Sequence, residues 1–281
     1  MRIILSGAFV FLLAVVSLAG QQAFSGRLSE TTCGASHHAN AGSLTDRQCV
    51  FLCIKRLAKW ALVDKGQVTP IANQDAMGLP LYAARLVRLT GESKGGAIFV
   101  TKVEAIPAHL HLGHVMTNWR DTPGGRGFLP VATDEARVAV QHARLAAKST
   151  ALDEIALHVG HVLHALDSAV EPKGPGAGYG VKKAATGAQQ HLQIAAKAEG
   201  ASETLAAEAA LVSTALASAL QGVDEAIASG QKARAATDAA EAARIATHLA
   251  GAVERIDENL EQAESRMTSL LKAEGLFGAP R

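Results

Sequence analysis

The hydrophobic periodicity of the chain changes near residue 106, and no other feature of the sequence limits the fold as strongly. Between residues 22 and 106, apolar residues recur at every second position, which is the period of a half-buried strand. From Pro107 onward Ala, Leu, Val, Glu, Lys and Gln predominate, and apolar residues recur every three or four positions, as on one face of a helix. The sequence of 281 residues therefore predicts an α+β protein, in which a β module at residues 21–106 precedes an all-α bundle.

The β module is expected to be small, with several short strands and one helix. Asp64-Lys65-Gly66 is a hairpin turn signal, and the Gly-rich stretch 91–96 marks a second turn. The strands are expected at residues 24–29, 60–63, 67–71, 85–90 and 97–104. Thr45 and Gln48 have the spacing of a capping box that opens a helix. Five short strands and one helix suit a small five-stranded OB-like barrel.

The first 20 residues have the pattern of a secretory signal peptide. After Met1 and Arg2, residues 3–19 are almost wholly apolar, and small residues around Ala19 supply a cleavage site. An uncleaved membrane anchor is the alternative, although 17 residues is at the short limit for a membrane span. We therefore expect a periplasmic or secreted protein of bacterial type, with no stable membrane insertion after the signal peptide has been removed.

The three cysteines, Cys33, Cys49 and Cys53, lie within the β module. Cys49 and Cys53 are spaced i, i+4, so their sulfur atoms share one face of the expected helix. Because thiols tend to oxidise outside the cytoplasm, one interpretation is a disulfide from Cys33 to Cys49 or Cys53, with one thiol left over. The other is a soft-metal site, in which the three thiolates and His37 or His38 bind zinc or copper(I). Of the two, we favour the disulfide.

The order of these parts carries a resemblance to a known group of proteins. The segments concerned are Cys33-Gly34-Ala35-Ser36-His37, the helix with Cys49 and Cys53, and Val87-Arg88-Leu89-Thr90-Gly91-Glu92. Over about 85 residues the chain resembles small exported bacterial OB-like β-barrel modules, which carry a C-G-x-x-H segment, a cysteine-bearing helix and a terminal V-x-V-T-G-x strand. Such modules are mostly of unknown function, so the resemblance implies a fold and little about activity. The strands lack paired aromatic residues on which bases stack, so nucleic-acid binding is not expected.

The helical region is expected to contain six helices, separated by turn signals. They are predicted at residues 108–119, 130–148, 151–168, 179–198, 202–228 and 231–273, and Gly230 is expected to separate the last two. Residues 201–281 are predicted to form a long amphipathic helical hairpin and a short tail. An apolar seam runs along the last helix, at Ile245, Leu249, Val253, Ile256, Leu260, Ala263, Met267 and Leu270. Such a seam is most often ordinary core, and less often a surface for a protein partner or for self-association.

Residues 107–200 contain an internal repeat. His111-Leu112-Gly113-His114 recurs 47 residues later as His158-Val159-Gly160-His161. Downstream, a Pro/Gly turn recurs, and Gln141-His142 is matched by Gln190-His191. Each unit is therefore expected to be a helical hairpin, with H-x-x-H on the first helix and one His on the returning helix. Two such hairpins would form a four-helix bundle with an approximate two-fold axis.

The repeated histidines are the strongest candidates for a functional site. Two His three residues apart lie on one helix face, about 5–6 Å from each other, so their imidazoles can share a metal ion. With the His of the returning helix, each hairpin would supply three imidazoles. The candidate metal ligands in the bundle interior are His111, His114, His142, His158, His161 and His191. Neutral imidazole suits copper, zinc, nickel or iron. Gly113 and Gly160 lower helix stability, which indicates the close approach of another helix, a metal cluster or a haem face.

The helical region is also similar in character to small periplasmic His-rich helical metal-binding proteins. The similarity rests on Gly113-His114-Val115, Gln141-His142, Gly160-His161-Val162 and Gln190-His191, over about 90 residues. It implies the sequestration or delivery of copper or other divalent ions. This chain departs from those proteins by carrying fewer His per helix and an added β module, which favours one or two defined sites over bulk buffering.

Three functions remain open on these observations. The first is an exported protein that binds a transition metal through imidazoles, for sequestration, delivery or sensing. The second is an electron carrier in which the same His are axial ligands of a non-covalent haem b. The third is a structural or adaptor protein that uses the helices of residues 202–273. An enzyme is not expected because no catalytic motif stands out, and a net charge of +1 gives no electrostatic footprint for nucleic acid.

Overall fold

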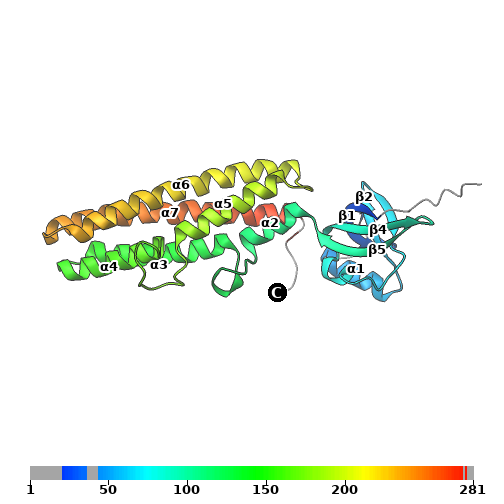
Figure 1. Ribbon diagram of the computed structural model, residues 1–281, viewed down its shortest axis with the longest axis horizontal. Coiled ribbons are helices and arrows are strands. Elements are labelled where there is room, and N and C mark those ends of the chain that lie inside the picture. The colour runs from blue at the N-terminus through cyan, green and yellow to red at the C-terminus, as the bar shows by residue number, and fades with distance from the viewer. Residues whose placement is uncertain (1–20, 37–43, 275, 277–281) are drawn as a thin grey trace, which may run out of the picture.

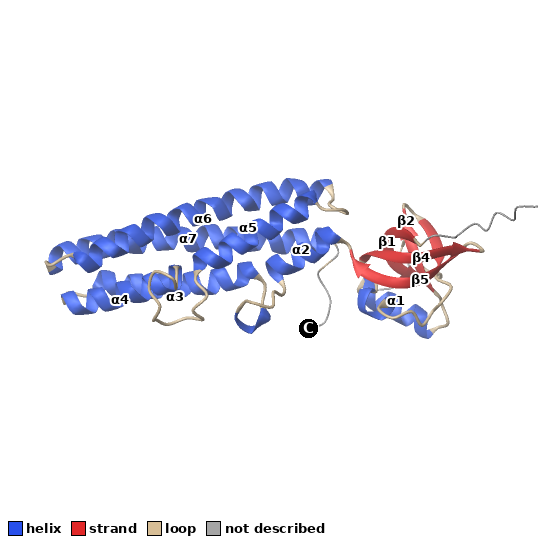
Figure 2. Ribbon diagram, in the orientation of Figure 1, coloured by secondary structure: helices blue, strands red, loops and turns tan. Residues whose placement is uncertain are grey.

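The computed structural model describes residues 21–36, 44–274 and 276, so the expected signal peptide and both His37 and His38 lie outside the described residues. Strands and helices occupy different parts of the molecule (Figure 1, Figure 2). A sheet with one helix beside it forms one end, and the long helices extend away from it. The expected α+β organisation, with strands first and helices after them, is confirmed.

The N-terminal unit is built on one five-stranded antiparallel sheet with the order β3-β2-β1-β4-β5. The strands are β1 Gln22–Glu30, β2 Trp60–Asp64, β3 Gln67–Pro70, β4 Leu86–Lys94 and β5 Ala97–Ala105. Each strand that the two-residue periodicity predicts is present. Ile71, directly after β3, forms an isolated parallel bridge with Ile98 of β5. One backbone contact therefore connects the two edges of the sheet.

The helix of this unit, α1 Asp46–Lys55, begins where the sequence predicts. The Thr45 side chain accepts a hydrogen bond from the Gln48 backbone N–H, and the Gln48 side chain bonds the Thr45 backbone N–H. This reciprocal capping box satisfies two of the free N–H groups at the helix start. Val50 of α1 is fully buried in the core of the sheet unit. This contact fixes the orientation of α1, and therefore the positions of Cys49 and Cys53 on it.

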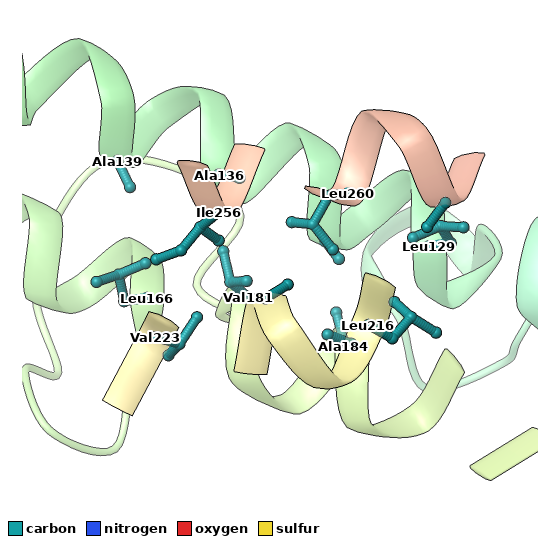
Figure 3. Close-up of a cluster of buried hydrophobic side chains, with 14 of the residues drawn as sticks. Leu129, Ala136, Ala139, Leu166, Val181, Ala184, Leu216, Val223, Ile256 and Leu260 are labelled. Carbon is teal, nitrogen blue, oxygen red and sulfur yellow. The ribbon is translucent and has the colours of Figure 1, made fainter. Parts of the chain in front are cut away.

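Six α-helices follow the sheet within the described residues. They are α2 Pro107–Met116, α3 Phe128–Lys148, α4 Leu152–Leu166, α5 Val181–Lys197, α6 Glu203–Ala235 and α7 Ala239–Ala273. Alanine supplies much of their common core, and Ala136, Ala139 and Ala184 are fully buried between larger residues such as Leu216 and Ile256 (Figure 3). Because alanine is small and favours helix, these helices can pack closely without losing helical propensity.

The expected helix break at Gly230 is wrong, since α6 continues through this residue to Ala235. A Cβ atom at Gly230 would lie 2.8 Å from Leu163 Cδ2 and 3.4 Å from Val159 Cγ1, both on α4. The glycine therefore serves the close packing of α6 against α4, and it does not form a turn. The turn that joins α6 to α7 lies at residues 236–238, where the Asp238 side chain caps α7.

The apolar seam of the last helix is core within this chain. Its residues from Leu249 to Leu270 are buried, and Ile245 is partly buried against the same cluster. Among the described residues, α6 has the length and hydropathy that would let a helix cross a membrane. It packs along α4, α5 and α7, as core helices of this composition do.

The pairing of α2 to α5 differs from the predicted hairpins. The main contacts are of α3 with α4 and of α2 with α5, whereas α2 touches α3 and α4 touches α5 much less. Residues 149–151 alone join α3 to α4, while residues 117–127 and 167–180 form the other two connections. A short connection makes consecutive helices antiparallel neighbours, so the closest hairpin spans the boundary between the two sequence repeats.

Candidate metal centres

The first candidate centre, called here the α2–α5 site, consists of His111 and His114 on α2 and His191 on α5. Its Nδ1 atoms converge: that of His191 lies 2.8 Å from that of His111 and 3.2 Å from that of His114. The ring centroids of His114 and His191 are 4.8 Å apart, with their planes perpendicular. Three imidazole nitrogens from two helices therefore point at one small volume.

The second candidate centre, the α3–α4 site, consists of His142 on α3 with His158 and His161 on α4. The Nδ1 atom of His142 lies 3.2 Å from that of His158 and 3.3 Å from that of His161. The arrangement repeats that of the α2–α5 site, because a pair of His one turn apart on one helix meets a single His from the neighbouring helix.

These separations match the ligand spacing around a transition metal. A metal–imidazole bond of about 2.0–2.1 Å with tetrahedral angles places ligand nitrogens about 3.3 Å apart. The Nδ1 separations of 2.8–3.3 Å fall at or slightly below this spacing. A neutral imidazole carries one proton on its two nitrogens, so three such rings facing inward present lone pairs that one cation can accept together.

The structure corrects the expected grouping of the six histidines. Each H-x-x-H pair meets the single His of the other repeat, so the six rings form two centres across the repeats and do not converge on one point in the interior. The reason is the helix pairing, which sets α2 beside α5 and α3 beside α4. All six side chains are partly exposed, because the fully buried positions on these helices belong to neighbours such as Leu112 and Val159.

The electrostatics of both centres favour the metal-binding form of imidazole. Burial lowers the pKa of His111, His114, His142, His161 and His191 below the usual value of 6.5. A charge on one ring lowers the pKa of the others further, as at His191, where His114 and His111 both contribute. These five rings are therefore mostly in the neutral form required for metal ligation at pH 7.

Aromatic rings enclose one side of the α2–α5 site, a feature that the sequence did not predict. The Trp119 ring centroid lies 4.8 Å from those of both His114 and His191, and Phe128 stacks on His191 at 5.4 Å. In the sequence repeat, Trp119 is matched by Leu166, and this difference was the available signal. The two centres therefore share a ligand set but differ in their surroundings.

The expected close approach of another helix at Gly113 and Gly160 is wrong. A Cβ at Gly113 would meet only Asn118 Oδ1, at 3.8 Å, and a Cβ at Gly160 would meet nothing within 4 Å. Close approach occurs instead at Gly187, where a Cβ would lie 2.5 Å from Phe128 Cε1. The two glycines inside the H-x-x-H segments thus leave open space.

The cysteines form a third group, called here the thiol cluster, from Cys33 after β1 and Cys49 and Cys53 on α1. The Sγ atom of Cys33 lies 3.9 Å from that of Cys49 and 3.7 Å from that of Cys53, and none of the three forms a disulfide. A disulfide bond is about 2.05 Å long, so the disulfide favoured from the sequence is not formed in this structure. His37 and His38, which the sequence suggests as further ligands, lie outside the described residues.

Two other histidines have structural contacts of their own. His109 is buried and its Nε2 lies 2.9 Å from Glu274 Oε2, while the other Glu274 oxygen accepts a hydrogen bond from Ser202. The Nδ1 of His164 lies 2.7 Å from the carbonyl oxygen of Glu171. The contacts of His109 join the ends of α2, α6 and α7, and that of His164 holds the turn after α4. Neither His belongs to a metal-ligand group.

A comparison of the chain with protein-family models, curated proteins and solved structures finds no match.

Proposed function

We propose that this protein is an exported transition-metal-binding protein whose two three-imidazole centres hold copper, zinc, nickel or iron without catalytic turnover. The observation that carries the proposal is the convergence of six repeated His into two trios with matching nitrogen separations. A single surface His needs no partner, whereas two equivalent trios, each built from two helices, would be hard to explain by chance packing. Sequestration, delivery and sensing are all consistent with such sites.

The geometry supports simple ligation over haem binding. Axial imidazoles lie on opposite faces of a haem, with the macrocycle between them. Here the Nδ1 atoms within each trio are 2.8–3.3 Å apart, which leaves no space for a macrocycle between the rings. The adaptor hypothesis has less support, because the seam on α7 that would offer an interaction surface is buried within the chain.

The proposal includes two further parts that rest on the sequence. The two sequence repeats that supply the trios are inferred to descend from one duplicated unit, since each repeat has an H-x-x-H pair and one His that follows Gln. Export is inferred from the apolar segment at residues 3–19, and an OB-like closure of the sheet from the strand count. A partly exposed, electrically neutral imidazole trio is suited to taking up an ion from solution and releasing it again.

Metal analysis and absorption spectroscopy of the purified chain test this proposal. We expect two equivalents of a divalent transition metal for each chain and no Soret band. The variant His114→Ala/His161→Ala removes one ligand from each centre and should lower both affinities by more than about 100-fold, since even loss of a partner that orients a ligand costs about 10–100-fold. His248→Ala, on the exposed face of α7, is the matched control and should bind as the unmodified chain does. Undiminished binding by the double variant would contradict the proposal.

A further inference from the structure

The thiol cluster lies in the sheet unit, and its three sulfur atoms come from two elements that the fold positions separately. Cys33 lies in the turn after β1, whereas Cys49 and Cys53 occupy successive turns of α1. All ligand atoms of the cluster lie within 4.8 Å of one another. The convergence goes beyond an i, i+4 pair on one helix, because the third sulfur atom belongs to a residue 16 positions earlier in the chain than Cys49.

The separations between the sulfur atoms are those of ligands around one ion. A metal–thiolate bond of about 2.3 Å with tetrahedral angles places two sulfur atoms about 3.8 Å apart. Cys33 Sγ lies 3.9 Å from Cys49 Sγ and 3.7 Å from Cys53 Sγ. Two of the three sulfur–sulfur separations therefore already match a thiolate site, and the third, between Cys49 and Cys53, is at most 4.8 Å.

The backbone around the cluster is held in place before any ion binds. The buried Glu30 carboxylate accepts hydrogen bonds from the backbone N–H groups of Thr32, at 2.5 Å, and Cys33, at 3.0 Å. On the other side, Arg47 of α1 donates to the carbonyl oxygens of Pro80 and Leu81. A ligand set held by such contacts loses little conformational entropy when it binds an ion.

The local charge also favours a cation. The buried Glu30 carboxylate accepts a hydrogen bond from the Cys33 backbone N–H, so a negative charge lies next to the cluster. This charge attracts a positive ion.

We propose that Cys33, Cys49 and Cys53 form a thiolate site for a soft metal cation, copper(I) in the first place, separate from the two imidazole centres. Soft thiolates select copper(I) and zinc. Structural zinc sites have four protein ligands, whereas copper(I) is commonly satisfied by three thiolates. The three sulfur atoms are therefore sufficient for copper(I), which is why we name this ion first. The proposal does not depend on the imidazole centres.

Anaerobic titration of the reduced chain with copper(I), in competition with a chromophoric copper(I) chelator, tests this inference. The His114→Ala/His161→Ala variant serves as the starting protein, so that binding at the imidazole centres does not contribute. We expect one tightly bound equivalent and a thiolate-to-copper charge-transfer band in the ultraviolet. Adding Cys53→Ser should weaken binding by more than about 100-fold, because a ligand is lost. Cys33→Ser should do the same, with circular dichroism to show that both variants fold.

Copper(I) affinity that changes less than threefold in both serine variants would overturn the thiolate site. Absence of the charge-transfer band would do so as well. One equivalent of zinc(II) that displaces copper(I) from the cluster would keep the ligands and overturn the choice of ion. Because the titration uses a protein whose imidazole centres are disabled, failure here leaves the proposed function untouched, and failure of the proposed function leaves this test unaffected.

Discussion

Metal binding should stabilise the helical bundle, because each centre ties two packed helices together and those of the α2–α5 site are far apart in sequence. His191 on α5 meets His111 and His114 on α2, so an ion at the α2–α5 site can bind only while these helices are packed. At a free zinc concentration 100 times Kd, one site adds about 2.7 kcal/mol to the free energy of unfolding. At about 2–4 °C per kcal/mol for a region of this size, the melting temperature should rise by about 5–11 °C for each site.

Calorimetry with and without zinc measures this rise. His191→Ala should remove the share that comes from the α2–α5 site and leave that of the α3–α4 site. The control His248→Ala, which changes an exposed His on α7, should keep the whole rise. A melting temperature that zinc does not change, or an equal rise in His191→Ala and the unmodified chain, would refute the reasoning.

Three further predictions follow from the same contacts. Burial lowers the pKa of His142 and His191 below 6.5, so metal affinity should stay flat from pH 8 to about 6.5 and should fall at lower pH. The stability of the metal-free bundle should fall over the same range, because the unfolded chain binds more protons there. Isothermal titration and denaturant melts at several pH values check both expectations. Copper(II) should quench the fluorescence of Trp119, whose ring centroid is 4.8 Å from that of His191, and should leave that of Trp60 in β2 unchanged. Trp119→Phe should therefore abolish the quenching, and unchanged quenching in this variant would contradict the geometry. In chemical denaturation, Gly160→Ala should stabilise the bundle by about 1 kcal/mol, because the added Cβ meets open space. Gly187→Ala should destabilise it by about 1–3 kcal/mol, because the added Cβ would clash with Phe128. Equal effects of the two variants would contradict this description of the packing.

The sequence predicted the local features of this fold well because local physical rules determine them. The capping box at Thr45 fixed the start of α1, and alternating apolar residues identified the five strands. The six candidate histidines also follow from a local rule, since residues three apart share a helix face. All six lie in the two trios that the structure brings together.

The grouping of those histidines could not be predicted from the repeat, because it depends on which helices become neighbours. A His at position 142 could meet either H-x-x-H pair, and the short connection from α3 to α4 decided for His158 and His161. The predicted helix break at Gly230 was wrong for a related reason. Gly230 has the appearance of a turn residue, yet the packing of Leu163 against it requires the small side chain inside a continuous helix.

The metal stoichiometry of two double variants tests the central claim most directly. His142→Ala/His158→Ala removes two ligands from the α3–α4 site alone, so the variant should still bind one equivalent with unchanged affinity. His111→Ala/His142→Ala removes one ligand from each centre and should bind none tightly. The opposite result, with no tight binding in the first variant and one equivalent in the second, would show that each hairpin forms its own centre and would contradict this account.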